Sequence, residues 1–445
     1  MTKFINFLPA FISNKLKGRT NFQEILANTG WLCGDKILQM GVGLLVGVWV
    51  ARYLGAEQLG QYGYASAFVV LFLAFATLGL NSIVPREIVR DPSSKEEIMG
   101  TAFILFLFSG LVTALITSAA IFLLRPHDSL MHWLVGILAA GMIFQAFNTI
   151  ELYFQSMLQS KYIVYAQNGA FIIISFSKIV LVLNHASLIV FVSLGLAETI
   201  LRAVGLVIAY RLNGQSMKGW RWNTLRAKSL LNFSWPLIFS SIFTLVNMQI
   251  DKVMIGEISG SIQVGLFSVA SRFTEMLYFL PVAVGFSVAP ALIKERAANV
   301  FSYHVKLQKT YNLMTVFAIA VAVPMTFLSK VLINILYGSA YSGSAHMLAI
   351  HIWSALFVFH TSIRSRSLII EGKQKFVLFY AFFAMISNVI FNYILIPKYG
   401  GVGASYASLL SWMLCVLLLP YISSKTSESV PMFLRSLNFI YLLKK

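Results

Sequence analysis

Residues 31–68 have the sequence WLCGDKILQMGVGLLVGVWVARYLGAEQLGQYGYASAF. This stretch contains an apolar run long enough to cross a bilayer, a short turn near Gly55, and the start of a second run. Asp35 and Lys36 interrupt the first run. Because a charge within a bilayer is costly, such a pair needs partners on other helices or a functional role.

The composition extends this pattern to the whole chain. Of the 445 residues, 58% are hydrophobic and 11% are charged, and the mean hydropathy is +0.78. A soluble globular domain has about 25% charged residues, so a water-soluble protein is excluded. Every stretch of about 40 residues holds an apolar run that approaches a bilayer crossing. The sequence therefore predicts an all-α polytopic membrane protein without a large soluble domain.

The apolar runs predict about twelve transmembrane helices in two groups of six. Residues 1–210 form the predicted N-terminal lobe, an interfacial segment plus six crossings, and residues 231–445 form the C-terminal lobe with a short cytoplasmic tail. A basic cytoplasmic linker, residues 211–230, separates them. The predicted crossings are residues 29–52, 61–84, 100–124, 130–158, 162–183, 187–210, 232–255, 264–289, 308–329, 345–370, 376–396 and 401–423.

The basic residues support this layout. Of the 34 Lys and Arg residues, 25 lie in segments on one predicted side and four lie on the other. Positive residues accumulate on the cytoplasmic side of membrane proteins, so we expect both termini in the cytoplasm. The formal charge of +18 is spread over seven segments, which argues against binding of nucleic acid.

A short internal similarity suggests a duplication. GQYGYASAF at residues 60–68 matches GLFSVASRF at residues 265–273, and each begins the second crossing of its half. Each is preceded by a helix with an adjacent acid and base, Asp35-Lys36 or Asp251-Lys252. The pattern predicts two parallel six-helix repeats about an axis along the membrane normal, enclosing a central cavity.

Ten ionisable residues lie within the predicted crossings: Asp35, Lys36, Glu151, Lys178, Glu198, Arg202, Asp251, Lys252, Arg272 and Glu275. Facing lipid, each would cost about 2.5 to 3.5 kcal/mol, so most must pair or line a wet interior. Asp35, Glu151 and Asp251 are the candidates for coupling a proton or Na⁺, and packing against a base of another helix is the alternative.

Other charges have simpler alternatives. Glu198 with Arg202, and Arg272 with Glu275, are spaced to pair along one helix, and Lys178 lies where it can snorkel. Arg364 suits capture of a phosphate, with a role as a positive-inside anchor as the alternative. The two cysteines lie apart in apolar runs, so no metal site or cofactor is expected.

Residues 31–68, followed by FATLGLNSIVPREIVRDP at residues 75–92, resemble the N-terminal signature of Wzx-type O-antigen and polysaccharide flippases. These flippases belong to the multidrug/oligosaccharidyl-lipid/polysaccharide exporter superfamily. The ARYLG turn, the YA motif and the RE-I-VR stretch carry the resemblance. It implies a V-shaped, MATE-like transporter of the bacterial inner membrane. It would move an undecaprenyl-diphosphate-linked oligosaccharide from the cytoplasmic to the periplasmic leaflet by alternating access, and an ion gradient would drive this movement.

The resemblance also implies a cation-lined cavity for the diphosphate and sugars, to which we assign six bases. Expected partners are membrane lipids, a polysaccharide polymerase and a chain-length regulator. Signature residues such as Arg52 and Glu87 are expected to set loop geometry and topology. The six bases are Lys36, Lys178, Arg202, Lys252, Arg272 and Arg364.

Two other functions are open. A multidrug exporter for organic cations favours an acidic cavity poor in arginine, so the intramembrane bases argue against it. A membrane glycosyltransferase or polymerase needs a sizeable outer loop with catalytic groups, and the predicted outer loops are short with few carboxylates. We therefore do not expect an enzyme.

Overall fold

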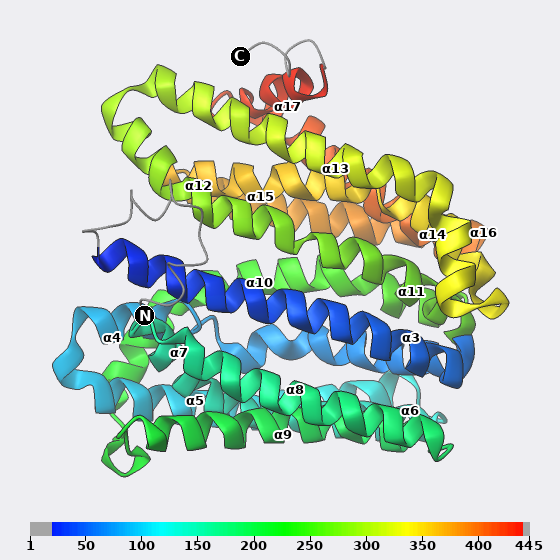
Figure 1. Cartoon of the computed structure of the whole chain (residues 1–445), viewed down its shortest axis with the longest axis horizontal. Helices are drawn as coiled ribbons and strands as arrows, with labels where there is room; N and C mark the ends of the chain where they lie inside the picture. The colour runs from blue at the N-terminus through cyan, green and yellow to red at the C-terminus, as the bar shows by residue number, and fades with distance from the viewer. Residues whose placement is uncertain (1–19, 439–445) are drawn as a thin grey trace. The chain divides into compact units, whose positions relative to one another are not determined.

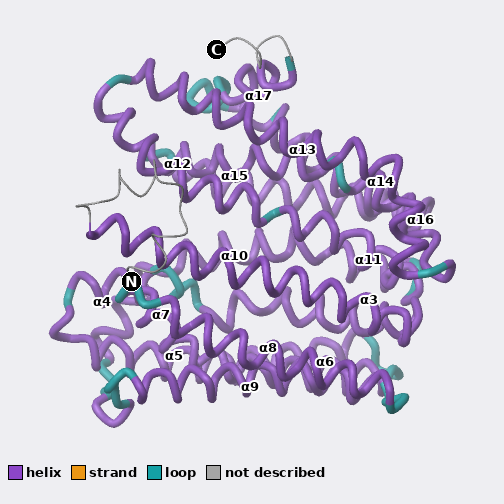
Figure 2. The backbone as a smooth tube through the Cα atoms, viewed as in Figure 1, coloured by secondary structure: helices purple, strands orange, loops and turns teal. Residues whose placement is uncertain are grey.

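The computed structural model describes residues 20–438, and its regular elements are all helices (Figures 1 and 2). The predicted interfacial segment and the end of the cytoplasmic tail lie outside the described residues. The elements are α3 (Thr20–Thr77), α4 (Ile83–Arg90), η1 (Pro92–Ser94), α5 (Lys95–Leu124), α6 (Ser129–Ala140), η2 (Gly141–Phe147), α7 (Asn148–Ser156), α8 (Ser160–Leu183), α9 (Leu188–Leu212), η3 (Met217–Gly219), α10 (Thr224–Ile258), α11 (Ser261–Leu277), α12 (Phe279–Ala298), α13 (Val300–Tyr337), η4 (Ser339–Tyr341), α14 (Ser342–His351), α15 (Ser354–Ile370), α16 (Gln374–Leu417), η5 (Leu419–Ile422) and α17 (Ser429–Leu437).

The helices account for the twelve predicted crossings. Within residues 20–438, nine helical segments are long and apolar enough to span a membrane, and α14 with α15 forms a tenth that is bent by 45°. Two of the nine, α3 and α16, are each divided by a kink at a glycine, Gly55 or Gly400. Both glycines have positive φ, 69° and 57°, which a side chain would strain. If each arm of α3 and of α16 counts as one crossing and the bent α14–α15 pair counts as another, the total is twelve.

The described chain forms two compact units. The first unit contains the residues up to Val50 together with Phe72–Ile238, and the second contains Ala51–Leu71 together with Phe239 onward. In the first unit, α4, α5, α7, α8 and α9 surround a core that includes Phe106, Phe154 and Tyr210. In the second, α12, α13, α15 and α17 pack around a core that includes Tyr311 and Phe359.

The segment predicted as a linker packs against the first unit. Helix α9 continues to Leu212 and α10 begins at Thr224, so only eleven residues between them lie outside these two long helices. Arg226 forms ion pairs with Asp91 at 3.0 Å and with Glu97 at 3.3 Å. These contacts fix the start of α10 on the ends of α4 and α5.

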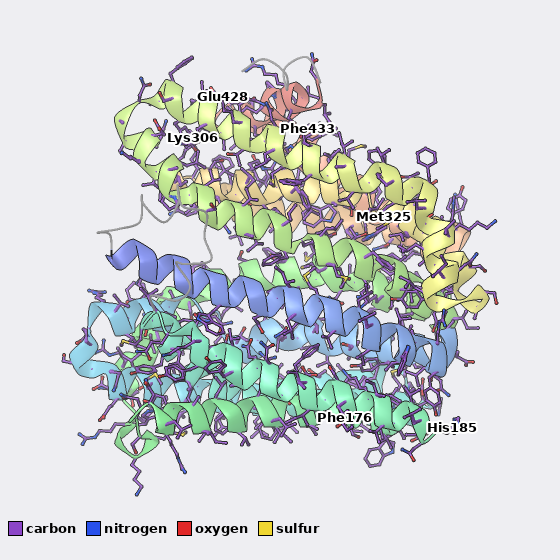
Figure 3. All side chains as sticks on the ribbon, in the orientation of Figure 1. Phe176, His185, Lys306, Met325, Glu428 and Phe433 are labelled. Carbon is purple, nitrogen blue, oxygen red and sulfur yellow. The ribbon has the colours of Figure 1, made fainter. Side chains whose placement is uncertain are left out.

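The last described helix, α17, is held by polar and aromatic contacts in the second unit. The hydroxyl of Ser436 lies 2.6 Å from that of Thr315 on α13, and Phe433 packs edge-on against His360 of α15. Phe433 and Glu428 are labelled at this end of the second unit in Figure 3. The amphipathic sequence of α17 thus becomes part of the core.

The two copies of the repeated nonapeptide contact each other within the second unit. A Cβ atom on Gly60 would lie 1.7 Å from the carbonyl oxygen of Ser261, and one on Gly265 would lie 1.9 Å from that of Ala56. An offset of 205 residues maps Gly60 to Gly265 and Ala56 to Ser261. Each copy therefore uses the same pair of positions, as a local twofold contact requires.

The turn before each copy repeats as well. Gly55 has φ 69° and ψ 174°. Gly260, which is 205 residues later, has φ 83° and ψ 172°. This backbone conformation is essentially restricted to glycine. The duplication inferred from nine residues thus extends to the conformation of the turn that precedes them.

Candidate functional site

A buried carboxylate in the second unit, Asp251 of α10, is the most extensively bonded acid within the membrane-spanning helices. Asp251 is 4% exposed. Its oxygens accept hydrogen bonds from the Asn392 amide and the Ser408 hydroxyl, each at 2.6 Å. Asn392 and Ser408 lie on opposite sides of the kink at Gly400. One carboxylate therefore joins both arms of α16 to α10.

Further neutral oxygen and nitrogen groups surround Asp251. Asn388 also hydrogen-bonds to the carboxylate, and it accepts a bond from Asn392 at 3.0 Å. The amide oxygen of Asn392 is buried and has no partner among the described residues. Carboxylate, amide and hydroxyl oxygens are ligands for hard cations such as Na⁺. The same carboxylate can instead hold a proton.

A small cavity adjoins Asp251. Its volume is about 20 Å³, which is enough for a water molecule or a small cation. Within residues 20–438, no group of three His, Cys, Asp or Glu side chains is placed to hold a metal ion. The groups around Asp251 are a carboxylate, amides and a hydroxyl. The cavity is lined by Asn247, Met248, Asp251, Phe267, Ser271, Glu275, Tyr278, His351, Ser408 and Trp412.

Lys252 pairs with Glu275 of α11 at 3.0 Å. The Lys252 side chain is 13% exposed and that of Glu275 is 34% exposed. Asp251 and Lys252 thus find partners on other helices, whereas Asp35 accepts a hydrogen bond from Gln39 of its own helix. Glu275 therefore has a base of another helix as a partner. Arg272, on α11, lies within electrostatic range of Tyr337.

A second group of charges lies in the first unit. Buried Asp35 accepts a hydrogen bond from Gln39 at 2.7 Å, and Glu151 accepts bonds from Gln155 and Gln167, each at 3.1 Å. These residues come from α3, α7 and α8. The structure therefore brings two of the three predicted coupling acids into one unit and places the third, Asp251, in the other.

Two of the six predicted bases belong to this first-unit group. Arg202 of α9 interacts electrostatically with both Asp35 and Glu151, and so does Lys36. Lys36 is exposed, whereas Arg202 is half-buried. Lys178 lies on α8 and is also half-buried. Lys36 and Arg202 thus form one electrostatic group with the two acids.

Arg364 lies in the interior of the second unit and is 3% exposed. Its guanidinium donates to the carbonyl oxygen of Cys415 at 2.8 Å and lies 4.4 Å from the ring centroid of Tyr380. Its Nε has no partner among the described residues. Arg364 therefore connects α15 to α16 through a backbone carbonyl and an aromatic face.

A larger cavity of about 250 Å³ lies beside the small one in the second unit. The two cavities share Asn247, Met248, Tyr278 and Trp412 in their walls. A group bound in the larger cavity would therefore contact side chains that also surround the Asp251 site. The remaining wall residues are Ser240, Phe243, Thr244, Pro281, Val282, Val358, Thr361, Ser362, Ser365, Val377, Tyr380, Ala381, Ala384 and Cys415.

The sequence interpretation did not select the neutral partners of these acids. Asn388 and Asn392 are four residues apart in an apolar helix, so they share a face. That pattern was an available signal, because buried amides in membranes require partners. Ser408 and Gln167 offered no comparable signal, since isolated hydroxyl and amide residues are common in membrane helices.

The signature residues act in local structure. The Arg52 guanidinium donates to the carbonyl oxygens of Ile335 and Leu336, near the end of α13. Buried Glu87 pairs with Arg86 at 3.1 Å and with Arg90 at 3.7 Å. Arg52 is a cation at the C-terminus of α13, where the helix dipole favours positive charge. Glu87 holds Arg86 and Arg90 together on α4. These contacts agree with the expected roles in loop geometry.

Two family models match the chain. The model described as "Polysaccharide biosynthesis protein" matches residues 25–294, which is more than half of the chain. The MatE model matches residues 236–394. The second match includes Asp251 and Asn392, and the first includes the whole first-unit group of charges.

The chain is also similar to individual proteins. It is 21% identical over 401 residues to the capsular polysaccharide biosynthesis protein CapF of Staphylococcus aureus, covering 86% of this chain and 94% of CapF. An uncharacterized membrane protein of Methanocaldococcus jannaschii, MJ1375, is 23% identical over 182 residues, covering 41% of this chain and 42% of that protein. The solved structure of the lipid II flippase MurJ, in an inward closed conformation, aligns with a TM-score of 0.74 at 17% identity. That alignment covers 94% of this chain and 93% of MurJ.

Proposed function

Because the chain belongs to the polysaccharide biosynthesis protein family, we propose that it is a flippase for a lipid-linked saccharide. The cargo is an undecaprenyl-diphosphate-linked oligosaccharide, a repeat unit of O-antigen or a related surface polysaccharide. It moves from the cytoplasmic to the periplasmic leaflet by alternating access. The names of CapF and of the lipid II flippase MurJ support this cargo class.

The observation that carries the proposal is the pair of adjoining cavities in the second unit. An acid with the donor set of a cation or proton site shares four wall residues with a cavity of about 250 Å³. A ligand and an ion that contact the same side chains change each other's affinity. This arrangement provides the coupling that an ion-driven carrier needs.

We assign the coupling ion to Asp251, with H⁺ or Na⁺ as the ion. Asn388, Asn392 and Ser408 would complete the oxygen set for Na⁺. For H⁺, protonation would remove the charge and leave the Asn392 and Ser408 donors competing for weaker acceptors. Asp35 and Glu151 are secondary candidates, because they lie in the first unit and neither is among the residues that line the two adjoining cavities.

We assign the diphosphate first to Lys36 and Arg202. Lys36 is exposed, and both bases belong to one electrostatic group. Lys178 and Arg272 remain candidates on charge type. Lys252, which is ion-paired to Glu275, and Arg364, which bonds a carbonyl, would first have to exchange partners.

The test is complementation in a bacterium whose own flippase gene for a surface polysaccharide has been deleted. The wild-type chain should restore surface polysaccharide and clear lipid-linked units from the cytoplasmic leaflet. Asp251→Asn should insert normally and fail to restore it, with Asp128→Asn, an acid at an interhelical turn, as the matched control. Failure of the inserted wild-type chain to restore surface polysaccharide in this strain would contradict the proposal.

Location and partners follow from the same proposal. We place the chain in the bacterial inner membrane with both termini cytoplasmic, where membrane lipids, a polymerase and a chain-length regulator surround it. The 25-to-4 distribution of basic residues supports this orientation. Reporter fusions at both termini should be active only as cytoplasmic reporters.

A second candidate function is export of organic cations. The match of residues 236–394 to the MatE model and the buried acid Asp251 favour it. This candidate predicts ethidium efflux that depends on Asp251 and a wild-type level of efflux in Lys36→Gln. The flippase predicts that Lys36→Gln impairs polysaccharide export and that ethidium is not expelled.

A further inference from the structure

The larger cavity of the second unit has a neutral wall. None of the side chains that line it within the described part of the chain is Asp, Glu, Lys, Arg or His. Arg364 lies beyond its edge, with the guanidinium against Tyr380 and the carbonyl of Cys415. A diphosphate would lose its hydration there without gaining a countercharge. The occupant must therefore be an uncharged group.

The wall also contains buried polar atoms that lack partners. The amide oxygen of Asn247 and the hydroxyl of Thr361 have no hydrogen-bond partner among the described residues. Asn247 is 6% exposed, on α10, and Thr361 lies on α15. Such groups in native proteins call for an explanation, and a bound ligand with hydroxyl groups is one.

Aromatic side chains complete the wall. Tyr278 lies between α11 and α12, and Tyr380 and Trp412 lie on opposite arms of α16. An aromatic face packs well against the apolar face of a ring, while the tyrosine hydroxyl and indole N–H bond to polar groups. The volume of about 250 Å³ equals roughly eight water molecules at about 30 Å³ each, which suits one sugar ring but not several.

From the neutral wall, the unpartnered polar atoms and the aromatic rings, we propose that this cavity is a monosaccharide subsite. It binds one uncharged sugar ring, with sugar hydroxyls bonded to Asn247 and Thr361 and the ring packed against Trp412. The proposal rests on the proposed function, since the sugar would belong to the lipid-linked cargo. Asn247 also lines the Asp251 cavity, so occupancy of the subsite would alter the cation site.

A polyprenyl chain is the competing occupant. It would fill the apolar part of the wall but would leave Asn247 and Thr361 unpaired. Each buried polar group left unpaired costs roughly a factor of ten in affinity. A sugar satisfies both groups and keeps the contact with the rings. The polar atoms therefore favour the sugar.

The experiment uses the full chain in phosphatidylcholine nanodiscs, free of sugar-based detergents. Saturation-transfer difference NMR measures binding of the methyl β-glycosides of glucose, galactose and N-acetylglucosamine, with geranylgeraniol as competitor. We expect at least one glycoside to bind. Thr361→Val, which is nearly isosteric, and Asn247→Leu should each weaken it about 5- to 10-fold.

Ser367→Ala is the matched control. Ser367 lies on the same helix, α15, but outside the cavity wall, and its hydroxyl donates to the carbonyl oxygen of Arg364 at 2.9 Å, so affinity should change less than twofold. The subsite is wrong if no glycoside binds at a concentration of about 50 mM, which is on the order of the weakest useful dissociation constant. Unchanged binding in Thr361→Val, or complete displacement by geranylgeraniol with no loss in the variants, also overturns it.

Failure of the subsite is distinguishable from failure of the flippase. Only the subsite is wrong if the wild-type chain restores surface polysaccharide while Thr361→Val and Asn247→Leu keep both polysaccharide export and glycoside binding. If glycosides bind as expected but the wild-type chain restores no polysaccharide, the proposed function falls and the subsite stands.

Discussion

Asp35-Lys36 and Asp251-Lys252 are the same dipeptide with different partners: both aspartates are buried, but only Lys252 forms an ion pair with a base-to-acid distance of 3.0 Å, whereas Lys36 is exposed. In the second unit, Asp251 is bonded to both arms of α16, and Lys252 pairs with Glu275. In the first unit, Asp35 is buried and bonded to Gln39 of its own helix, while Lys36 is exposed. One dipeptide is fixed by partners on other helices, and the other leaves its base available.

The two dipeptides are also not equivalent in the repeat. Asp35 precedes Gly55 by 20 residues, whereas Asp251 precedes Gly260 by nine. A difference of eleven helical residues corresponds to about 16 Å along the helix axis. The similarity of the dipeptides is therefore not inherited from the duplication. Each must be explained by its own neighbours, which separates the ion coupling that we propose for Asp251 from the anion binding that we propose for Lys36.

The largest effect is expected from removing the charge of Asp251, and the same change at Asp35 should have a much smaller effect. Asp251→Asn keeps the shape of the side chain but removes the carboxylate that binds the proposed ion, so polysaccharide export should fall at least about 100-fold. Asp35→Asn should lower export only a few-fold, because Asp35 accepts its hydrogen bond from Gln39 of the same helix and does not line the cavities at the proposed ion site. Export is measured as surface polysaccharide per unit of inserted protein. Equal losses in both variants would remove the distinction between the two acids.

The next largest effect is on the free energy of unfolding, and it distinguishes Lys252 from Lys36. Breaking a buried ion pair costs about 3–5 kcal/mol and an exposed one less than about 1 kcal/mol. Lys252 and Glu275 are intermediate in exposure, so Lys252→Met should cost about 2 kcal/mol, whereas Lys36→Met should be nearly neutral.

Thermal unfolding in one detergent measures both variants. Adding Glu275→Gln to Lys252→Met should recover part of the loss, because the uncompensated carboxylate is removed. A double variant as unstable as the sum of the two single variants would show that the pair is not coupled. A large loss in Lys36→Met would mean that this base is also held by partners.

The fold was largely predictable from the sequence, because apolar length and the distribution of basic residues determine the number of crossings. The breaks at Gly55 and Gly400 were predicted as short turns between crossings, whereas the positive φ of each glycine is seen only in the structure. The site was less predictable. Asp251 stood out as a charge in an apolar run, but its partners Asn392 and Ser408 are more than 140 residues away. Only the packing of α10 on α16 brings them together.

The contact between Gly60 and Gly265 within the second unit gives a further prediction about stability. Gly63 faces its own repeat equivalent, Ser268, whose hydroxyl would lie 2.8 Å from an added Cβ. That hydroxyl belongs to a side chain and can rotate, whereas Gly60 faces a backbone carbonyl that cannot. Gly63→Ala should therefore cost about 1 kcal/mol or less and Gly60→Ala several times more.

Unfolding temperatures of Gly60→Ala, Gly265→Ala and Gly63→Ala test the local twofold contact. Gly60→Ala and Gly265→Ala should agree within error, since each meets the carbonyl at the position equivalent to the other's partner. Clearly different losses at these two positions would show that the contact is not symmetric in energy.

The smallest effect is expected at an acid outside the membrane-spanning helices, Asp91. Hydrogen bonds from Ser93 and Ser94, and then from Arg226, lower the pKa of Asp91 from 3.8 to about 2. The folded pKa lies below the unfolded one, so Asp91 stabilises the fold above pH 3.8 and loses that contribution as the pH falls toward 2. The unfolding temperature of Asp91→Asn should lie slightly below wild type at pH 6, and the difference should shrink between pH 4 and pH 2. Because Asp91 is at the surface, salt should also reduce the difference. A difference that persists unchanged to pH 2 would mean that Asp91 acts through the shape of its side chain rather than its charge, unlike the two intramembrane acids.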